Sequence, residues 1–132
     1  MQIKLIPAAI ILALLAIMAA CETETGIAKE ILDIEPDFRV TAAEIAAEYA
    51  ISESDANDKY KGKVVVVTGV IKEIYRAFLY TPYVDLEAGV RCSFSDVEDE
   101  VMLTLSVGQT ISMKGQGDRL LFGVELRGCT VE

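Results

Sequence analysis

The chain contains no histidine, and its three cysteines lie far apart, with no Cys-x-x-Cys pair. Zinc is usually held by closely spaced cysteine and histidine ligands, and histidine is the side chain most often used as a general acid or base. No serine stands in a nucleophile motif, and no glycine-rich loop is suited to hold phosphate. We therefore expect no enzyme, no metal site and no cofactor. A pair of carboxylates brought together by folding is the one catalytic arrangement that the sequence leaves open.

Basic residues are also scarce, because 12 lysines and arginines face 21 acidic residues, for a net charge of −9. An acidic body repels phosphate backbones, whereas nucleic-acid binders usually carry a basic face. It also repels anionic lipid headgroups, so any attachment to a membrane should come from lipid and not from charge. Nucleic acid is therefore disfavoured as a partner. The excess of acid has a simpler reading too, since it keeps an exported protein soluble.

The N-terminus has the layout of an export leader. Lys4 precedes an uncharged stretch, Leu5–Ala20, that contains a proline. At about 1.5 Å per residue this stretch is too short for a ~30 Å hydrocarbon core, and the pattern fits a signal peptide. It ends in Met18–Cys21, Met-Ala-Ala-Cys, which resembles the bacterial lipobox, although the lipobox usually has leucine where Met18 stands.

We therefore predict that residues 1–20 are a lipoprotein signal peptide and that Cys21 is the lipid-attachment residue. The resemblance implies a diacylglyceryl thioether and an N-terminal acyl chain, and two or more chains hold a protein firmly on a membrane. The protein would lie in the cell envelope and face the periplasm or the cell exterior. The alternatives are an uncleaved membrane anchor and an ordinary secreted protein.

If Cys21 carries lipid, Cys92 and Cys129 remain as an even pair in an oxidising compartment, where disulfides persist. A bridge between them would contribute roughly 4 kcal/mol in the chain-entropy model. Free cysteine also packs well as a small apolar side chain, so two buried thiols are the alternative.

The mature chain is long enough for one domain. Residues 21–40 are acidic, contain Pro36 and show no sustained period, which predicts a tether. We place the folded domain at residues 41–132. Thr41 and Glu44 form a capping box that opens a helix, with Tyr49 as a packing residue.

A second helix should begin with a cap at Ser54 and Asp55, should carry Tyr60 as another packing residue, and should end at Gly62. The pattern then changes to β-branched and alternating residues. We expect strands at residues 64–75, 83–87, 90–94, 109–114 and 120–131, turns at 88–89 and 115–118, and a helical turn within 95–105. Gly69 should bend the first strand, and Gly128 should bulge the last one so that Cys129 and Val131 face the core.

Five strands with a helical segment between the third and the fourth describe an OB-fold, a Greek-key barrel, here preceded by one or two short helices. The amino-acid sequence also resembles that of the tRNA_anti-like family of exported OB-fold proteins. The resemblance runs from Thr41 to Val131 and rests on Thr41–Ile45, Ala56–Lys63, Val67–Gly69, Cys92, Phe94, Val107–Gln109, Gly115 and Cys129.

OB-folds bind ligands over their second and third strands and the adjoining loops. Aromatic and guanidinium groups, which stack on bases, sugars or peptide side chains, gather in the corresponding part of this chain. The ligand-binding residues that we predict are Tyr75, Arg76, Phe78, Tyr80, Tyr83, Arg91 and Arg119, with Asp118 in the last hairpin. The alternative is that the rings close the end of the barrel.

An acidic run, Asp96–Glu100, lacks the spacing of a calcium loop, so it fits a solvated helix start better than a cation site. The sequence thus favours a lipid-anchored, non-catalytic OB-fold binding module whose partner is a protein or another envelope component. The alternatives are an oligonucleotide- or nucleotide-binding protein, which rests on analogy of fold, and a carrier of a small ligand or metal ion.

Overall fold

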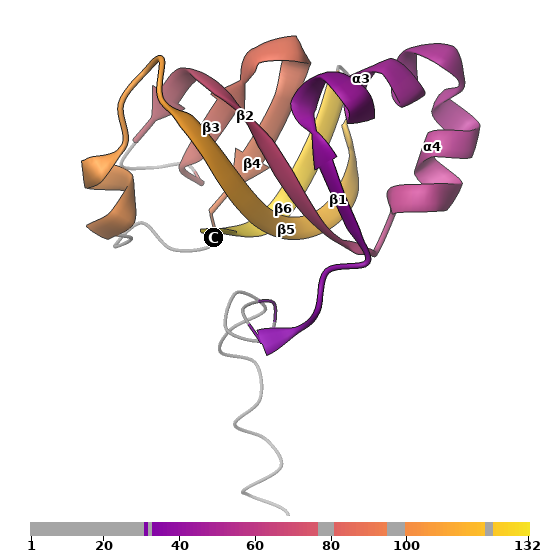
Figure 1. Cartoon of the computed structure of the whole chain (residues 1–132), viewed down its shortest axis with the longest axis horizontal. Helices are drawn as coiled ribbons and strands as arrows, with labels where there is room; N and C mark the ends of the chain where they lie inside the picture. Colours follow the sequence, from indigo (N-terminus) through magenta and orange to yellow (C-terminus); the bar gives the residue numbers. More distant parts are fainter. Residues whose placement is uncertain (1–30, 32, 77–80, 95–99, 121–122) are drawn as a thin grey trace, which may run out of the picture.

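The computed structural model describes residues 31, 33–76, 81–94, 100–120 and 123–132 (Figure 1). The elements in chain order are β1 (Phe38–Thr41), α3 (Ala42–Ile51), α4 (Glu53–Tyr60), β2 (Val64–Tyr75), β3 (Tyr83–Leu86), the 3-10 turn η1 (Glu87–Gly89), β4 (Val90–Ser93), the 3-10 turn η2 (Glu100–Thr104), β5 (Thr110–Leu120) and β6 (Gly123–Val131).

Strands β2 to β6 close into a barrel with the neighbour order β2-β3-β4-β6-β5, and β2 pairs again with β5. The first half of β2 is antiparallel to β5 and the second half is antiparallel to β3. A parallel pair, β4 with β6, completes the ring. The mainly β, five-stranded OB-fold barrel preceded by two short helices is therefore confirmed (Figure 1).

Gly69, where the sequence predicts a bend of the long strand β2, is a point of close packing, and the register of β2 shifts a little later, between Ile71 and Glu73. A Cβ atom on Gly69 would lie 2.9 Å from the Cβ of Ala42 and 3.2 Å from Cδ1 of Leu86. Glycine therefore lets α3 approach the strand closely while β2 passes from its partner β5 to its partner β3.

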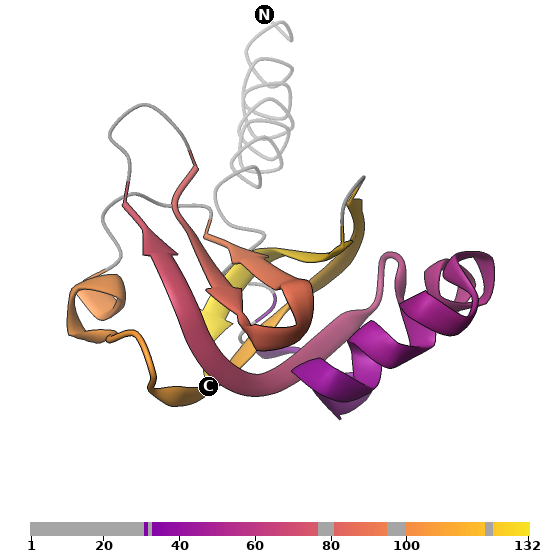
Figure 2. The ribbon, with the colours of Figure 1, turned by 90° about the horizontal axis from the view of Figure 1, so that it is seen from above.

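The core fills the inside of the barrel with apolar side chains from all five strands. Val65, Val67, Leu86, Val90 and Leu126 are among the members that have no exposed surface or almost none. The two helices lie on one side of the barrel, and η2 lies on the opposite side (Figure 2). From those two sides Ile45 of α3 and Met102 of η2 add buried side chains to the core.

Local capping explains where the helices begin. The Thr41 hydroxyl accepts from the N–H of Glu44 at 3.1 Å, and the Glu44 carboxylate accepts from the N–H of Thr41 at 3.0 Å, so the predicted capping box is confirmed. The cap predicted at Ser54 is wrong, because the Ser52 hydroxyl accepts from the N–H of Asp55, so the cap lies two residues earlier and α4 begins at Glu53. Ser52 is the one residue between the two helices, and it is both the C-cap of α3 and the N-cap of α4.

Strand β1 begins at Phe38, before the predicted start of the domain at Thr41, and ends at Thr41. It runs parallel to β2, with Phe38 opposite Val65. The Arg39 guanidinium holds the Glu132 carboxylate through two hydrogen bonds of 2.9 and 2.8 Å. The chain therefore enters the domain along the edge of β2 and is tied there to Glu132, the residue after β6.

The turn predicted at residues 115–118 is wrong, because β5 continues through them to Leu120. Gly115 and Gly117 do not form a turn but allow neighbouring segments to pack closely against β5. A Cβ on Gly117 would lie 2.0 Å from the Tyr60 carbonyl oxygen, and a Cβ on Gly115 would lie 2.7 Å from Sγ of Cys129. The bulge predicted at Gly128 is confirmed, since Gly128 has a φ of 59° and the β5–β6 register shifts beside it.

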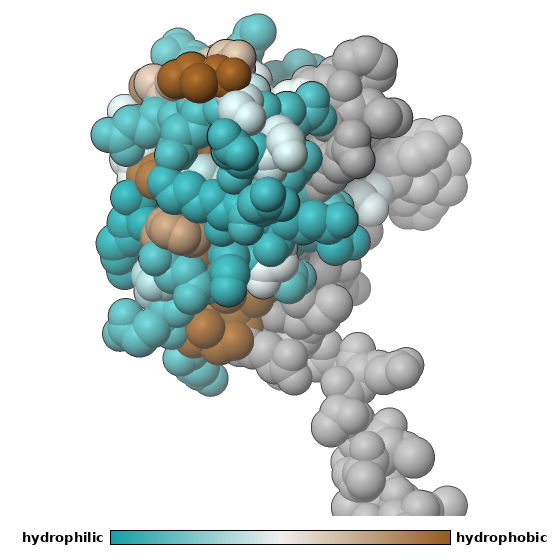
Figure 3. Space-filling view, turned by 90° about the vertical axis from the view of Figure 1, so that its right-hand side faces the viewer, coloured by the Kyte–Doolittle hydropathy of each residue, from teal (hydrophilic) through white to brown (hydrophobic). Residues whose placement is uncertain are grey.

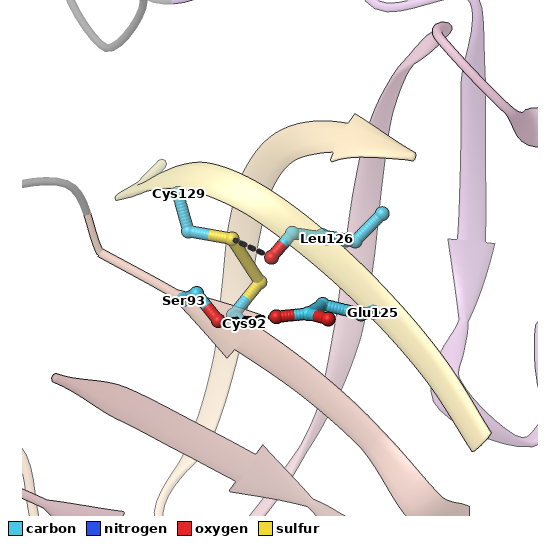
Figure 4. Close-up of a disulfide and its surroundings, with 5 residues drawn as sticks. All are labelled: Cys92, Ser93, Glu125, Leu126 and Cys129. Carbon is cyan, nitrogen blue, oxygen red and sulfur yellow. Dashed lines mark hydrogen bonds between the residues drawn. A yellow bond between two sulfur atoms is a disulfide. The ribbon is translucent and has the colours of Figure 1, made fainter. Parts of the chain in front are cut away.

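Cys92 of β4 and Cys129 of β6 form a disulfide, with the two Cα atoms 5.7 Å apart (Figure 4). Both side chains are buried in the core. The covalent bond therefore links the two strands whose parallel pairing closes the barrel.

The side of the molecule on which α3 and α4 lie is mainly hydrophilic, and its apolar side chains form small, separate spots (Figure 3). Among the described residues, no helix combines the length and the apolar character that crossing a membrane requires. The residues of the predicted leader, Cys21 included, and most of the predicted tether lie outside the described residues.

Candidate functional site

The outer surface of β3, β4 and β6 carries the polar side chains that alternate with the core residues of these strands. The members are Tyr83, Asp85, Arg91, Ser93, Glu125 and Arg127, which we call the β3–β4–β6 face. The register places Tyr83 opposite Ser93, and Arg91 between Asp85 and Glu125. Because successive side chains of a strand point to opposite faces, these residues form two neighbouring rows across the three strands.

Aromatic and guanidinium planes stack along one edge of this face. Tyr75 at the end of β2 stacks on Tyr83, with ring centroids 4.8 Å apart and an angle of 15° between the planes. The Arg91 guanidinium carbon lies 3.8 Å from the centroid of the Tyr83 ring. A cation so close to a ring face is attracted by the π electrons. The three side chains thus form one continuous, half-exposed stack.

A carboxylate compensates the charge of this stack. The Arg91 guanidinium donates from Nε and Nη2 to the two carboxylate oxygens of Asp85, at 2.7 and 3.0 Å. These hydrogen bonds are the main reason why the pKa of Arg91 is raised. The forked geometry also fixes the plane of the guanidinium group against the Tyr83 ring. The stack therefore offers flat surfaces without a net positive charge.

A cleft of about 330 Å³ adjoins the stack on the same face. Its lining residues are Thr81, Ser93, Phe94, Gln116, Glu125, Arg127 and Gly128. Within it the Ser93 hydroxyl donates to the Glu125 carboxylate at 2.7 Å, and both side chains lie beside the buried disulfide (Figure 4). The Arg127 Nε bonds Asp118 of β5 at 2.8 Å. The cleft thus combines an apolar wall with a few fixed polar groups, the usual make-up of a ligand site.

Of the predicted ligand-binding residues, Tyr75, Tyr83 and Arg91 come together in the stack. Arg76 does not join them, since its Nη2 donates to the carbonyl oxygens of Met102 at 2.6 Å and Leu105 at 3.4 Å. Arg76 therefore holds the 3-10 turn η2 against the barrel.

The side chains of the other predicted aromatic and arginine residues lie outside the described part of the chain. Phe78 and Tyr80 lie outside the described residues. Arg119 takes its place in β5 opposite Val124, and its side chain also lies outside the described part of the chain. Binding at these positions, and at the stack, stays a prediction.

Ser93, Glu125 and Arg127 of the cleft were not predicted from the sequence, because they belong to no cluster of aromatic and arginine residues. A signal for them was present. The buried residues Cys92 and Leu126 fix the inward face of β4 and β6, so their neighbours must point outward. What the sequence could not supply is the register between β4 and β6, which brings Ser93 next to Glu125.

A second hollow, of about 500 Å³, lies on α4 and is lined by Glu53, Ser54, Asn57, Asp58 and Lys61. All of its lining residues come from α4 and the residue after it, and none is aromatic. Within the described ranges, no group of three or more Cys, Asp or Glu side chains is placed to hold a metal ion. Most of the acidic run after Phe94 lies outside those ranges. The β3–β4–β6 face is therefore the better candidate site.

Comparison with known proteins finds one matching family and a similar solved structure. The sequence model of the tRNA_anti-like family matches residues 1–130. A similar solved structure is the crystal structure of a "putative nucleic acid-binding lipoprotein" from Klebsiella pneumoniae, which is 20% identical, has a TM-score of 0.57 and covers 71% of this chain and 90% of its own. At that identity the likeness shows the fold alone. A comparison with curated proteins found no match.

Proposed function

The chain belongs to the tRNA_anti-like family, and from that membership we propose that it is a lipid-anchored, non-catalytic OB-fold binding module of the cell envelope. Its partner is a protein, bound on the β3–β4–β6 face. The observation that carries the proposal is the half-exposed stack of Tyr75, Tyr83 and Arg91 beside a cleft. Tyrosine and arginine are enriched in protein interfaces because they offer large, stiff contact areas with a polar end.

The chemistry of the site supports binding in preference to catalysis. The chain has no histidine. Two carboxylates at this site are engaged in ion pairs, Asp85 of the face with Arg91 and the adjoining Asp118 with Arg127. Histidine is the side chain most often used as a general acid or base, so its absence disfavours catalysis.

Single-stranded nucleic acid is the second candidate. Two observations favour it: the stack, because bases stack on aromatic rings and guanidinium planes, and the name of the Klebsiella protein. The charges oppose it. The net charge is −9, and both arginines of the face are paired with carboxylates. Phosphate contacts supply most of the affinity of such binders, and here no surplus of positive charge is offered.

The partner experiment compares capture by wild type with capture by a Tyr75→Ala, Tyr83→Ala double variant after crosslinking in intact envelopes. Ile51→Ala is the control, because Ile51 lies on α3 and is 85% exposed. We expect the double variant to lose the captured protein and the control to keep it. Identical capture by all three proteins would remove the face as the binding surface.

The lipid anchor has its own test. Mass spectrometry of protein extracted from membranes should find an N-terminal peptide that begins at Cys21 and carries a diacylglyceryl group and an acyl chain. A Cys21→Ser variant should lose the lipid and leave the membrane fraction. An unmodified Cys21, or a chain that still begins at Met1, would contradict the lipoprotein assignment.

A further inference from the structure

The carboxylates in the charged row of the β3–β4–β6 face outnumber the guanidinium groups that pair with them. The row runs across neighbouring strands from Asp85 to Arg91, Glu125 and Asp118, as the register pairs show. Arg91 is engaged by Asp85 through both donating nitrogens, and Asp118 is engaged by Arg127. Three carboxylates thus share two guanidinium groups. Glu125 lies opposite Arg91 and interacts with its charge, but among the described side chains it is the carboxylate of this row that takes part in neither ion pair.

Glu125 also faces a space that a ligand can enter. It is the only carboxylate among the described residues that line the cleft. Its Oε1 accepts from the Ser93 hydroxyl at 2.7 Å, a neutral donor that orients the carboxylate without cancelling its charge. Arg127 is the one cation among the described lining residues, and its guanidinium group is engaged in an ion pair with Asp118.

The walls around this carboxylate suit an aliphatic stem. Phe94 and the bulged Gly128 line the cleft together with Thr81. Lysine and arginine lay their methylene groups along apolar surface and keep the charged end at a polar group. A cleft of about 330 Å³ is at the lower end of the size of ligand pockets, which is ample for one such side chain.

We propose that this cleft binds a basic side chain, a lysine or an arginine, of the protein partner, with the cationic end on Glu125. The inference rests on the proposed function and deepens it, because it names the chemistry that the partner must present. The net charge of −9 acts in the same direction, since it attracts a partner with a basic surface.

The probe is the capped peptide acetyl-Gly-Lys-Gly-amide, titrated into the folded protein at low salt while backbone amide NMR shifts are recorded. We expect shifts confined to the residues around the cleft, such as Ser93, Glu125 and Gly128. Glu125→Gln should weaken binding roughly tenfold, the usual loss when a charged acceptor becomes neutral. Added salt should weaken the binding of the wild type as well.

Two controls give the test its meaning. The same peptide with norleucine in place of lysine keeps the stem and lacks the charge, so it should bind far more weakly. Glu87→Gln removes an exposed carboxylate in η1, away from the cleft, and should leave the affinity unchanged. Equal binding of the two peptides, equal losses in both variants, or shifts scattered over the surface would overturn the inference.

The crosslinking experiment separates this inference from the proposed function. If Glu125→Gln captures the partner as wild type does while the Tyr75→Ala, Tyr83→Ala variant does not, the face binds the partner and the cleft does not take a basic side chain. If none of the variants changes capture, the proposed binding face itself is wrong. If both variants lose capture and the peptide binds as expected, both proposals stand.

Discussion

At the scale of single residues, Gly117 is the position at which one added carbon should cost most. A Cβ there would lie 2.0 Å from the Tyr60 carbonyl oxygen and 2.8 Å from its carbon, and both are backbone atoms that cannot rotate away. Gly117→Ala must therefore push α4 off β5. We expect a loss of roughly 3 kcal/mol in the free energy of unfolding, measured by urea denaturation.

Gly62→Ala is the matched control for that substitution. Gly62 also lies near the end of α4, and a Cβ on it would meet no atom within 4 Å, but its φ is +75°. An alanine there is strained only by its backbone, at about 1 kcal/mol. If Gly117→Ala were no more destabilising than Gly62→Ala, the close packing of α4 on β5 would be refuted.

Glu48 should give the protein part of its sensitivity to acid. Hydrogen bonds from Lys59 Nζ, at 2.6 Å, and from the Tyr60 hydroxyl lower the pKa of this carboxylate below its ordinary value of 4.5. A lowered pKa adds stability that is complete above the ordinary value and is lost as the pH falls through the value in the folded state.

The variant Glu48→Gln isolates this effect. The difference between the urea midpoints of wild type and variant should be largest near neutral pH and should shrink as the pH falls below 4.5. Because the carboxylate is partly exposed, we expect the difference to be small and to fall with added salt. A difference that is constant from neutral to acid pH would show that the carboxylate is not paired in solution.

At the scale of elements, the disulfide should carry much of the stability of the barrel closure. The parallel pairing of β4 with β6 spans only Val90 to Cys92. The Cys92–Cys129 bond joins the same two strands across a sequence separation of 37. Replacing both cysteines by alanine should cost about 2–5 kcal/mol of unfolding free energy.

Chemical denaturation with and without a reductant measures this loss. Reductant should lower the midpoint of unfolding of the wild type towards that of the double alanine variant, and it should leave the variant itself unchanged. A wild type that is indifferent to reductant under conditions that expose its core would argue against the bond.

Elements defined by local chemistry were predictable from the sequence. The capping box at Thr41, the bulge at Gly128 and the alternation in β4 each depend on residues next to one another in the chain. Strand β5 was predicted too short because glycine has two uses. The sequence shows Gly115 and Gly117 but not Tyr60 or Cys129 pressed against them, so a turn was the natural local interpretation.

The candidate site was predictable only in part, for the same reason. Tyr75 and Tyr83 are close in sequence, and their meeting follows from the hairpin of β2 and β3. The position of Arg76 depends instead on η2, and Glu125 enters the face only through the parallel pairing of β6 with β4. Such contacts join segments far apart in the chain, and no local pattern encodes their register.

At the scale of the whole molecule, charge separates the two candidate functions. The face that an OB-fold offers to ligands here carries paired arginines on a body with a net charge of −9. A protein partner with basic residues is attracted by that field, whereas a nucleic acid strand is repelled. The stack alone could hold bases, so binding of a nucleic acid strand depends on whether base stacking outweighs the electrostatic repulsion of its phosphates.

The balance between stacking and repulsion can be measured by the anisotropy of a fluorescently labelled single-stranded oligonucleotide of about 15 nucleotides, which is long enough for one OB-fold. We expect no change of anisotropy with the wild type at low salt. A variant with Asp85→Asn, Asp118→Asn and Glu125→Gln keeps the three side chains of the stack and releases both arginines from their ion pairs, so it should bind, and salt should weaken its binding. Tight, salt-sensitive binding by the wild type would instead make nucleic acid the partner, because stacking would then have overcome the repulsion of the acidic body.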